Sequence, residues 1–591
     1  MPRERQGKAR RTTARGGRQQ EADEAPIRSG GPARSLWAAL IVTLGIALLC
    51  LPLLLHEKLP QGSDVFSTMH YLQGFMKAFS EGDLYPRWTD RSNQQLGGPS
   101  FVMFVPVTFY GAGATAWLTG SVISGFKLYI LLVSALTGAA LFLLARDWLG
   151  AVIPAALAAA LYLLLPYHVL DIYQRFAMSE TTAFVTTALT LFFLRRDADR
   201  PGLIPFLGGA ISYAILVGTH LISGFMMTLV LAFWIPWDRG FVPRRLARPL
   251  IMMACGLGLA APALLPAVLE KASANISWVT ETANGDYRRN FLYSDDVLPG
   301  LGFKDPVKPP VRRSAHAQLL LAGVAAVAAI GGSAKGTRRR RDAVGLSIVS
   351  GMTYLLQTPL SIPIWTIIPE LPTIQFPWRF QSIQVLSASL LCGMALGTPA
   401  RFPGRRLLLY ALAGAVLVNL GVAWSNAHLK PYNFGADDAR HPGVEFWMDP
   451  TLTPVEFASY KRFKQMRVSV PVAELQSGTG SVEVVEWLSS RRKVTVSSDT
   501  GGTLVLRSFW FPGWVAQMDG ERVPIRPSTE LALQTIEVPA GRHTVELSFE
   551  QTPVRRASTW IGLVALIATP ALGVILGRAG LEPTAAATRE T

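Results

Sequence analysis

The sequence alternates long apolar runs with short polar segments, and this alternation limits the possible folds more than any other feature. The first run, Leu36–Leu55, has twenty residues and no charged side chain. At about 1.5 Å of rise per residue, such a helix spans a hydrocarbon core of about 30 Å. Of all residues, 50% are hydrophobic and 16% are charged, which is typical of polytopic membrane proteins. The sequence therefore excludes a soluble fold.

Further apolar runs predict about twelve membrane helices in all. After the first, they are Val122–Ala145, Ala151–Pro166, Met178–Leu194, Leu203–Thr219, Leu221–Trp237, Pro249–Leu269, Gln318–Gly332, Ala343–Leu356, Phe376–Leu396, Leu407–Trp424 and Trp560–Leu576. The stretch Val102–Leu118 is also apolar. We expect it to form an interfacial or re-entrant helix, and a helical hairpin that crosses twice is the alternative.

Clusters of Arg and Lys follow alternate runs, for example at Arg195 and Arg196 and at Arg338–Arg341. Because cytoplasmic loops accumulate these residues, we expect both termini and every such cluster on the cytoplasmic side. The formal net charge of +16 then follows mainly from topology, and we expect no nucleic-acid partner. Cys50, Cys255 and Cys392 all lie in predicted helices, so no disulfide is expected in the outer regions.

The last outer region changes its hydrophobic period to two, the pattern of half-buried strands. Asp519-Gly520 between two such segments predicts a hairpin, since both residues tolerate positive φ. We predict an α-helical polytopic membrane protein with a C-terminal extracytoplasmic β-sandwich before the last helix. The expected divisions are a disordered basic tail (1–35), a transmembrane domain (36–425, first outer loop 56–121), the β-rich domain (426–556), the last helix (557–579) and a cytoplasmic tail (580–591).

The first outer loop carries two candidate site residues soon after the first helix. Asp64 can accept a proton from an acceptor hydroxyl, or hold a divalent metal such as Mg²⁺ or Mn²⁺ that acts indirectly. A solvated helix cap is the alternative interpretation. His70 follows at a spacing of six, which is not that of one helix face, so a metal pairing with Asp64 is only weakly indicated. Farther along, Arg87 and Trp88 are candidate substrate contacts, with Trp88 stacking on a sugar or anchoring at the interface.

The segment Leu164–Glu180 places His168, Asp171, Arg175 and Glu180 in the second outer loop and the start of the next helix. Asp171 and Arg175 are four apart and can form a surface pair. Alternatively, Arg175 binds the phosphate of a lipid-linked donor while the acids address a hydroxyl or a metal.

Two more ionisable residues lie at the ends of predicted helices, on the outer side of the membrane. His220 occupies a very short outer turn, and Arg379 lies in the segment FPWRF. Ionisable groups at membrane depth usually face a cavity or a partner. For Arg379, anchoring at the membrane interface is the alternative.

The segments DVFSTMHYLQGFMKAFSEGDLYPRW, PYHVLDIYQRFAMSE, VGTHLISG and FPWRF together resemble the bacterial pyruvoyl-tetrahydropterin-synthase-related and YfhO-like membrane proteins. FWFPGWVAQMDGERVPI also looks like the terminal β-domain of the YfhO type. The architecture is similar to that of GT-C glycosyltransferases, which implies a plasma-membrane enzyme that moves a sugar from a polyprenyl phosphate to an outer glycan or glycopolymer acceptor. By position, the resemblance implies Asp64 as catalytic acid/base or metal ligand, Asp171 and Glu180 as second acids, and Arg175 or Arg379 as donor-phosphate contact.

Two other functions fit parts of the pattern. One is a transporter or flippase for lipid-linked saccharides, but such proteins often show internal repeats, and none is visible here. The other is a non-catalytic envelope assembly protein, in which Asp64 would tolerate substitution.

Overall fold

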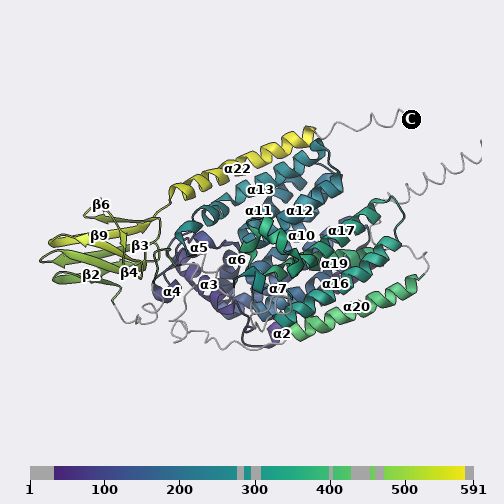
Figure 1. Cartoon of the computed structure of the whole chain (residues 1–591), viewed down its shortest axis with the longest axis horizontal. Helices are drawn as coiled ribbons and strands as arrows, with labels where there is room; N and C mark the ends of the chain where they lie inside the picture. The colour runs from purple at the N-terminus through teal and green to yellow at the C-terminus, as the bar shows by residue number, and fades with distance from the viewer. Residues whose placement is uncertain are drawn as a thin grey trace, which may run out of the picture.

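The computed structural model describes residues 32–275, 285–293, 308–397, 404–427, 453–458 and 471–579. This part of the chain is a bundle of long helices with two antiparallel β-sheets at one end (Figure 1). The final helix, α22 (Pro553–Ala579), returns from the sheets along the bundle, where it packs on α13 (Pro243–Leu269). The predictions for the two terminal tails lie outside the described residues, except that the first helix already begins at Pro32.

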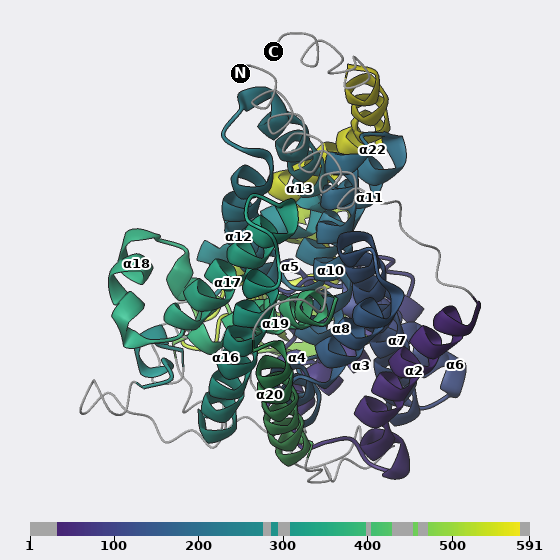
Figure 2. The same ribbon diagram turned by 90° about the vertical axis from the view of Figure 1, so that its right-hand side faces the viewer.

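Each predicted apolar run forms a helix, which confirms the sequence pattern. In chain order, and besides α13 and α22, these helices are α2 (Pro32–Leu55), α7 (Val122–Leu149), α8 (Val152–Leu164), α10 (Met178–Asp199), α11 (Leu203–Thr219), α12 (Leu221–Arg239), α16 (Lys308–Gly331), α17 (Arg338–Leu355), α19 (Gln381–Leu396) and α20 (Arg405–Asn426). Figure 2 shows them packed side by side, with α2 at one edge and α13 with α22 at another.

The number of membrane spans needs a correction. Within the described residues, eight helices are long and apolar enough to cross a membrane, and α17 with the short helices after it makes a ninth, bent by 97°. Two of the other helices are short, with 17 residues in α11 and 16 in α19, while α10 has charged residues in its last turns. The chain is thus a multi-pass membrane protein with eight or nine candidate spans rather than about twelve.

The predicted cytoplasmic clusters meet at one end of the bundle. Arg195 pairs with Asp342 at 3.2 Å, and Arg338 pairs with Asp199 at 2.5 Å. Arg248 forms a third pair of this kind with an acid of α10. These contacts join the C-terminal end of α10 to the N-terminal ends of α13 and α17, so these three basic clusters share one end of the bundle. The opposite end, which carries the sheets, is called the β-domain end below.

The first loop holds four short helices at the β-domain end. They are α3 (Val65–Ser80), α4 (Ser92–Gln95), α5 (Ser100–Met103) and α6 (Val107–Thr119). With 13 residues, α6 is about 20 Å long, too short to cross the hydrocarbon core. Gly120 in the left-handed conformation ends it. The predicted stretch 102–118 therefore contains the end of the four-residue α5 and one helix of interfacial length, and neither is long enough for an arm of a two-crossing hairpin.

The β-domain consists of two antiparallel sheets, ordered β1-β4-β8-β7 and β2-β3-β9-β5-β6. Buried residues alternate along β3, as in Val494 and Val496, whereas β4 is buried at every position from Leu504 to Phe509. Asp519 and Gly520 join β5 to β6 with φ of 53° and 90°, which confirms the hairpin. The strands are β1 (Ala473–Leu475), β2 (Gly480–Trp487), β3 (Arg491–Ser498), β4 (Gly502–Phe509), β5 (Trp514–Met518), β6 (Glu521–Val523), β7 (Arg526–Pro527), β8 (Leu533–Val538) and β9 (Gly541–Phe549).

The three cysteines are confirmed as buried helix residues. Cys50 lies in α2, Cys255 in α13 and Cys392 in α19, and none is in a disulfide. They act as small apolar side chains in the bundle.

Candidate functional site

An open cavity of about 380 Å³ lies at the β-domain end, where the start of α3 meets the starts of α10 and α12. One part of its wall is ionisable and is formed by Asp64, Arg175, Glu180, His220 and Arg379. Another part is apolar and includes Tyr71, Met103, Phe104, Val105, Phe109, Leu221 and Ile222. The cavity therefore offers charged groups and a hydrophobic surface to one ligand.

Local breaks in helical geometry create the ionisable wall. Leu165 is extended before Pro166, as residues preceding proline usually are, and this ends α8. After the short helix α9 (Pro166–Leu170), Asp171–Arg175 forms a π-helical turn, and Phe176 follows with φ of 59°. Such turns and positive φ values at a bulky residue are uncommon and concentrate at functional sites.

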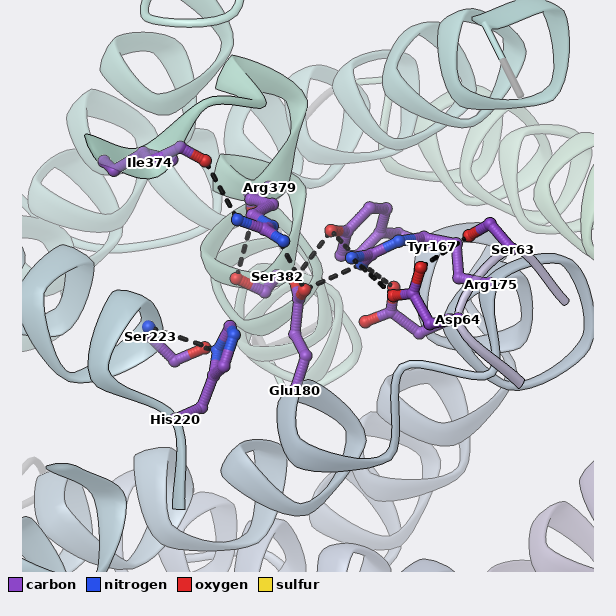
Figure 3. Close-up of polar contacts among 11 residues, drawn as sticks. Ser63, Asp64, Tyr167, Arg175, Glu180, His220, Ser223, Ile374, Arg379 and Ser382 are labelled. Carbon is purple, nitrogen blue, oxygen red and sulfur yellow. Dashed lines mark hydrogen bonds and ion pairs between the residues drawn. The ribbon is translucent and has the colours of Figure 1, made fainter. Parts of the chain in front are cut away.

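The π-turn buries an ion cluster around Arg175 (Figure 3). Arg175 Nη1 donates to Asp171 Oδ1 at 2.5 Å and to Glu180 Oε2 at 2.7 Å. Tyr167 donates its hydroxyl to Glu180 Oε1 at 2.7 Å, and the Trp378 ring lies 4.8 Å from the guanidinium carbon. The side chains of Asp171 and Glu180 are 0% and 1% exposed, respectively. Two predicted acids thus neutralise a buried arginine, and the Asp171–Arg175 pair is no surface pair.

Asp64 occupies the N-cap position of α3, but its side chain makes no capping bond. Its backbone N–H donates to Arg175 O at 2.7 Å, and the Ser63 hydroxyl donates to its Oδ1 at 2.9 Å. Arg175 Nη2 lies 3.7 Å from Asp64 Oδ2, and the Asp64 side chain is 41% exposed. Within the described lining, Asp64 and Glu180 are the two carboxylates, and Asp64 is the accessible one.

Gly62 allows the Asp64 segment to approach the π-turn. A Cβ atom at Gly62 would lie 2.4 Å from the Arg175 carbonyl carbon and 2.6 Å from Phe176 N. Both are backbone atoms and cannot rotate away, so a side chain at this position must push the two segments apart.

We therefore expect Gly62→Ala to lower any activity that depends on Asp64 by about 10²-fold, as displacements near 1 Å can. Gly421→Ala is the matched control, because Gly421 lies in α20 and has open space at its Cβ position. The measurement is the initial rate of that activity in membranes that contain equal amounts of each variant. Equal rates in wild type and Gly62→Ala would show that the contact does not position Asp64.

Arg379 reaches the cavity from the 3₁₀ turn Pro377–Phe380 that precedes α19. Its Nη1 donates to the Ile374 carbonyl at 2.9 Å, and its Nε lies 3.7 Å from Glu180 Oε2. No carboxylate among the described residues lies within hydrogen-bonding distance of it. Unlike Arg175, which donates to two acids, Arg379 keeps donor capacity for an anionic ligand.

His220 links α11 to α12 and faces the same cavity. The Ser223 backbone N–H donates to His220 Nδ1 at 3.3 Å, and the Ser223 hydroxyl lies 2.7 Å from the same nitrogen. Because Nδ1 accepts a hydrogen bond, the neutral ring carries its proton on Nε2. His220 can therefore donate a hydrogen bond from Nε2.

Two predicted substrate contacts in the first loop lie away from the cavity. His70 is 4% exposed, and its Nδ1 contacts Phe66 O of its own helix at 2.8 Å rather than Asp64. Burial lowers the pKa of His70. Arg87 donates to the Pro262 carbonyl at 3.1 Å. Neither residue lines the cavity.

Trp88 and His168 are fully buried, each at 0% exposure. Trp88 packs against the β-domain, so its ring has no open face for a sugar. His168 stacks on Phe184 with ring centroids 4.2 Å apart, and its Nδ1 lies 2.9 Å from Tyr162 O. The structure therefore brings six of the ten predicted residues to one place and keeps His70, Arg87, Trp88 and His168 outside it.

Tyr167 was not predicted as a site residue, because it follows an apolar run and a proline and has no charge of its own. In the described part of the chain, no three His, Cys, Asp or Glu side chains are placed to share a metal ion. Asp64 offers one carboxylate next to the Arg175 cation, and the Mg²⁺ or Mn²⁺ hypothesis stays a prediction.

Comparisons with known proteins identify structural neighbours but no family. No family model and no curated protein matches the sequence. Among solved structures, the chain is similar to the arabinofuranosyltransferase AftD from Mycobacteria at 15% identity and a TM-score of 0.41, covering 66% of this chain and 27% of AftD. It is also similar to the oligosaccharyltransferase AglB from Archaeoglobus fulgidus at 14% identity and a TM-score of 0.40, covering 72% of this chain and 61% of AglB. That AglB structure contains an inhibitory peptide and a dolichol-phosphate.

Proposed function

We propose that this protein is a membrane glycosyltransferase that moves a sugar from a polyprenyl-phosphate donor to an acceptor outside the cytoplasm. The observation that carries the proposal is the cavity at the β-domain end. It combines an accessible carboxylate, an arginine with remaining donor capacity and an apolar wall. A lipid-linked sugar phosphate presents the matching groups, namely hydroxyls, one anionic phosphate and a hydrocarbon chain.

The proposed reaction is a direct displacement at the anomeric carbon. The acceptor hydroxyl oxygen forms a bond to that carbon while the bond from the carbon to the phosphate oxygen breaks, and the electron pair leaves with the phosphate. Asp64 accepts the hydroxyl proton as general base. Arg379 stabilises the charge of the leaving phosphate. His220 donates a hydrogen bond from Nε2 to the bound substrate. A single displacement of this kind inverts the anomeric configuration.

The apolar wall suits the first isoprene units of the donor. Met103, Phe104 and Val105 form a continuous strip of this wall, and Leu221 and Ile222 at the start of α12 add to it. A hydrocarbon chain bound there covers the apolar side chains of the wall and removes their surface from water, at about 25 cal/mol per Å². We propose that the donor enters from the bilayer and that the acceptor is a glycan or glycopolymer of the cell envelope.

We further propose where this protein is located and which proteins it is related to. The basic clusters at the opposite end favour placing the cavity and the β-domain outside a bacterial plasma membrane, with both termini in the cytoplasm. The quoted sequence segments favour membership of the pyruvoyl-tetrahydropterin-synthase-related or YfhO-like proteins.

The test is transfer of labelled sugar in membranes from cells that express the protein. Membranes receive polyprenyl-phosphate-linked sugars one at a time, and incorporation into the envelope glycan fraction is compared with membranes that lack the protein. Protein-dependent incorporation from one donor supports the proposal. Protein-dependent movement of the intact donor across sealed vesicles without incorporation would instead indicate a flippase.

A further inference from the structure

We propose that the β-domain positions the catalytic cavity by seating on the first loop, with Trp88 as the central positioning residue. The inference rests on the proposed function for its effect on transfer, but its structural part can be measured separately. We define the seat as residues 81–98, the segment between α3 and α5. It contacts the β-domain on one side and leads to Asp64 and the apolar cavity wall on the other.

Trp88 fills the centre of the seat. Its side chain is 0% exposed, and its ring lies 5.4 Å from Trp514 and 5.3 Å from Phe549, measured between centroids. Phe511 completes the set at 6.4 Å. All three partners belong to the β-domain, whereas Trp88 belongs to the loop. A fully buried tryptophan between two parts of a structure contributes much of the energy that holds them together.

Backbone and polar contacts surround this aromatic centre. The Ser489 backbone N–H donates to Glu81 Oε2 at 2.8 Å, and the Ser489 hydroxyl donates to Asp90 Oδ1 at 3.3 Å. The Phe509 N–H donates to the Leu96 carbonyl at 2.8 Å. Contacts at both ends and in the middle of the seat fix its orientation as well as its distance from the β-domain.

The seat holds a strained backbone that these contacts stabilise. Asn93, Gln94 and Gln95 have φ of 54°, 56° and 65° in succession. Non-glycine residues adopt this left-handed conformation only when their surroundings enforce it. Arg507 of the β-domain donates to the Gln94 carbonyl at 3.3 Å. Without the β-domain in place, this turn would relax.

The seat also contacts α3 directly. Gly74 of α3 packs so closely on the seat that a Cβ there would lie 2.9 Å from Thr89 Cβ. Lys77 of α3 pairs with Asp90 of the seat. The helix has 16 residues, a length of about 24 Å, and Asp64 precedes its first residue. The β-domain therefore holds one end of α3, and the accessible carboxylate lies at the other.

The seat also leads into the apolar wall of the cavity. The Phe101 N–H donates to the Arg87 carbonyl at 3.2 Å, and Ser100 bonds to Thr89 at 2.5 Å. Met103–Val105 of the wall follow immediately. Tyr71 of α3 contacts Phe104 with ring centroids 5.0 Å apart. A shift of the seat therefore moves α3, which follows Asp64, and the Met103–Val105 part of the apolar wall.

The measurement uses a cysteine in the cavity as a reporter. Ser67 of α3 lines the cavity, and the native cysteines are at most 9% exposed. In the full-length protein in membranes, Ser67→Cys is labelled with a membrane-impermeant maleimide, alone or together with Trp88→Ala. We expect Trp88→Ala to raise the labelling rate about tenfold, because Ser67 is only partly exposed while the β-domain is seated. Trp117→Ala is the matched control, because Trp117 is 78% exposed on α6.

A second variant covers the case in which Trp88→Ala fails to accumulate. Glu81→Ala removes the acceptor for the Ser489 N–H and the ion pair of Glu81 with Lys77 at 3.2 Å, and it is expected to raise labelling by a smaller factor. Labelling rates equal to the parent in both variants would overturn the inference. Transfer rates, where transfer is detected, should fall in the same order through kcat more than through the donor KM. If labelling rises but wild type transfers no sugar, the glycosyltransferase proposal fails while the positioning role stands.

Discussion

Asp64→Asn is expected to lower the rate constant of sugar transfer by about 10²- to 10⁴-fold, the usual contribution of a general base. Asparagine has nearly the same shape but cannot accept the acceptor proton. The backbone bond from residue 64 to Arg175 O does not involve the side chain, and an amide oxygen still accepts from Ser63. The segment should therefore keep its position while the chemistry is lost.

The donor KM distinguishes this loss from a binding defect. Asn removes one negative charge beside Arg175 and Arg379, so an anionic donor should bind equally well or more tightly. We expect kcat to fall without a rise in KM, measured as labelled-sugar transfer at matched protein levels. Glu57→Gln is the control, since Glu57 is exposed in the same loop and does not line the cavity. Full activity in Asp64→Asn would move the base to Glu180, the other described carboxylate of the lining.

Much of the fold could be predicted because hydrophobic period is a local property. Apolar runs predicted the helices, alternation of apolar and polar residues predicted the strands, and Asp519-Gly520 predicted the hairpin between β5 and β6. Fewer described helices meet the length and composition of a span than predicted, because α11 and α19 are as apolar as a span but shorter. A helix inside the bundle and a helix that crosses the membrane have the same local signature.

The site was predicted in part, and the errors have a common cause. The acids and arginines that meet at the cavity were expected from their position at helix ends on one face. Tyr167 and the π-turn were not, because they depend on which helices pack together. Trp88 was expected to stack on a sugar or to anchor at the membrane interface, yet it packs against Trp514 of the β-domain, more than 400 residues later in the chain. Local sequence cannot tell a ring that faces a cavity from one that faces another domain.

The two arginines of the cavity have different hydrogen-bond partners, and their roles differ accordingly. Arg175 is neutralised by Asp171 and Glu180 and holds the π-turn together. Arg379 is anchored by a backbone carbonyl and by a longer contact to Glu180. A buried cation with two acids has little capacity left for a substrate, so the geometry favours Arg379 over Arg175 as the phosphate contact.

Arg175→Met is expected to destabilise the protein by about 3–5 kcal/mol, the usual effect of removing one partner from a buried ion cluster. Methionine replaces the length of the side chain but leaves Asp171 and Glu180 buried without their cation. Asp171 is affected most, because within the described residues its Oδ2 has no hydrogen-bond partner even in the wild type. Thermal aggregation of the detergent-solubilised protein measures the effect as a lower midpoint temperature. Arg313→Met is the control, because Arg313 is exposed on α16.

A charge-removal series separates lost neutralisation from lost packing. If unpaired acids cause the instability, adding Asp171→Asn and Glu180→Gln to Arg175→Met should recover most of the lost midpoint temperature, since neutral amides cost less to bury than carboxylates. If packing of the guanidinium on Trp378 dominates, the triple variant should stay as unstable as Arg175→Met alone. A midpoint temperature unchanged in Arg175→Met would mean that the two acids are protonated in the wild type. In that case the cluster is a hydrogen-bonded network, and its cation is not needed to keep the acids in the bundle.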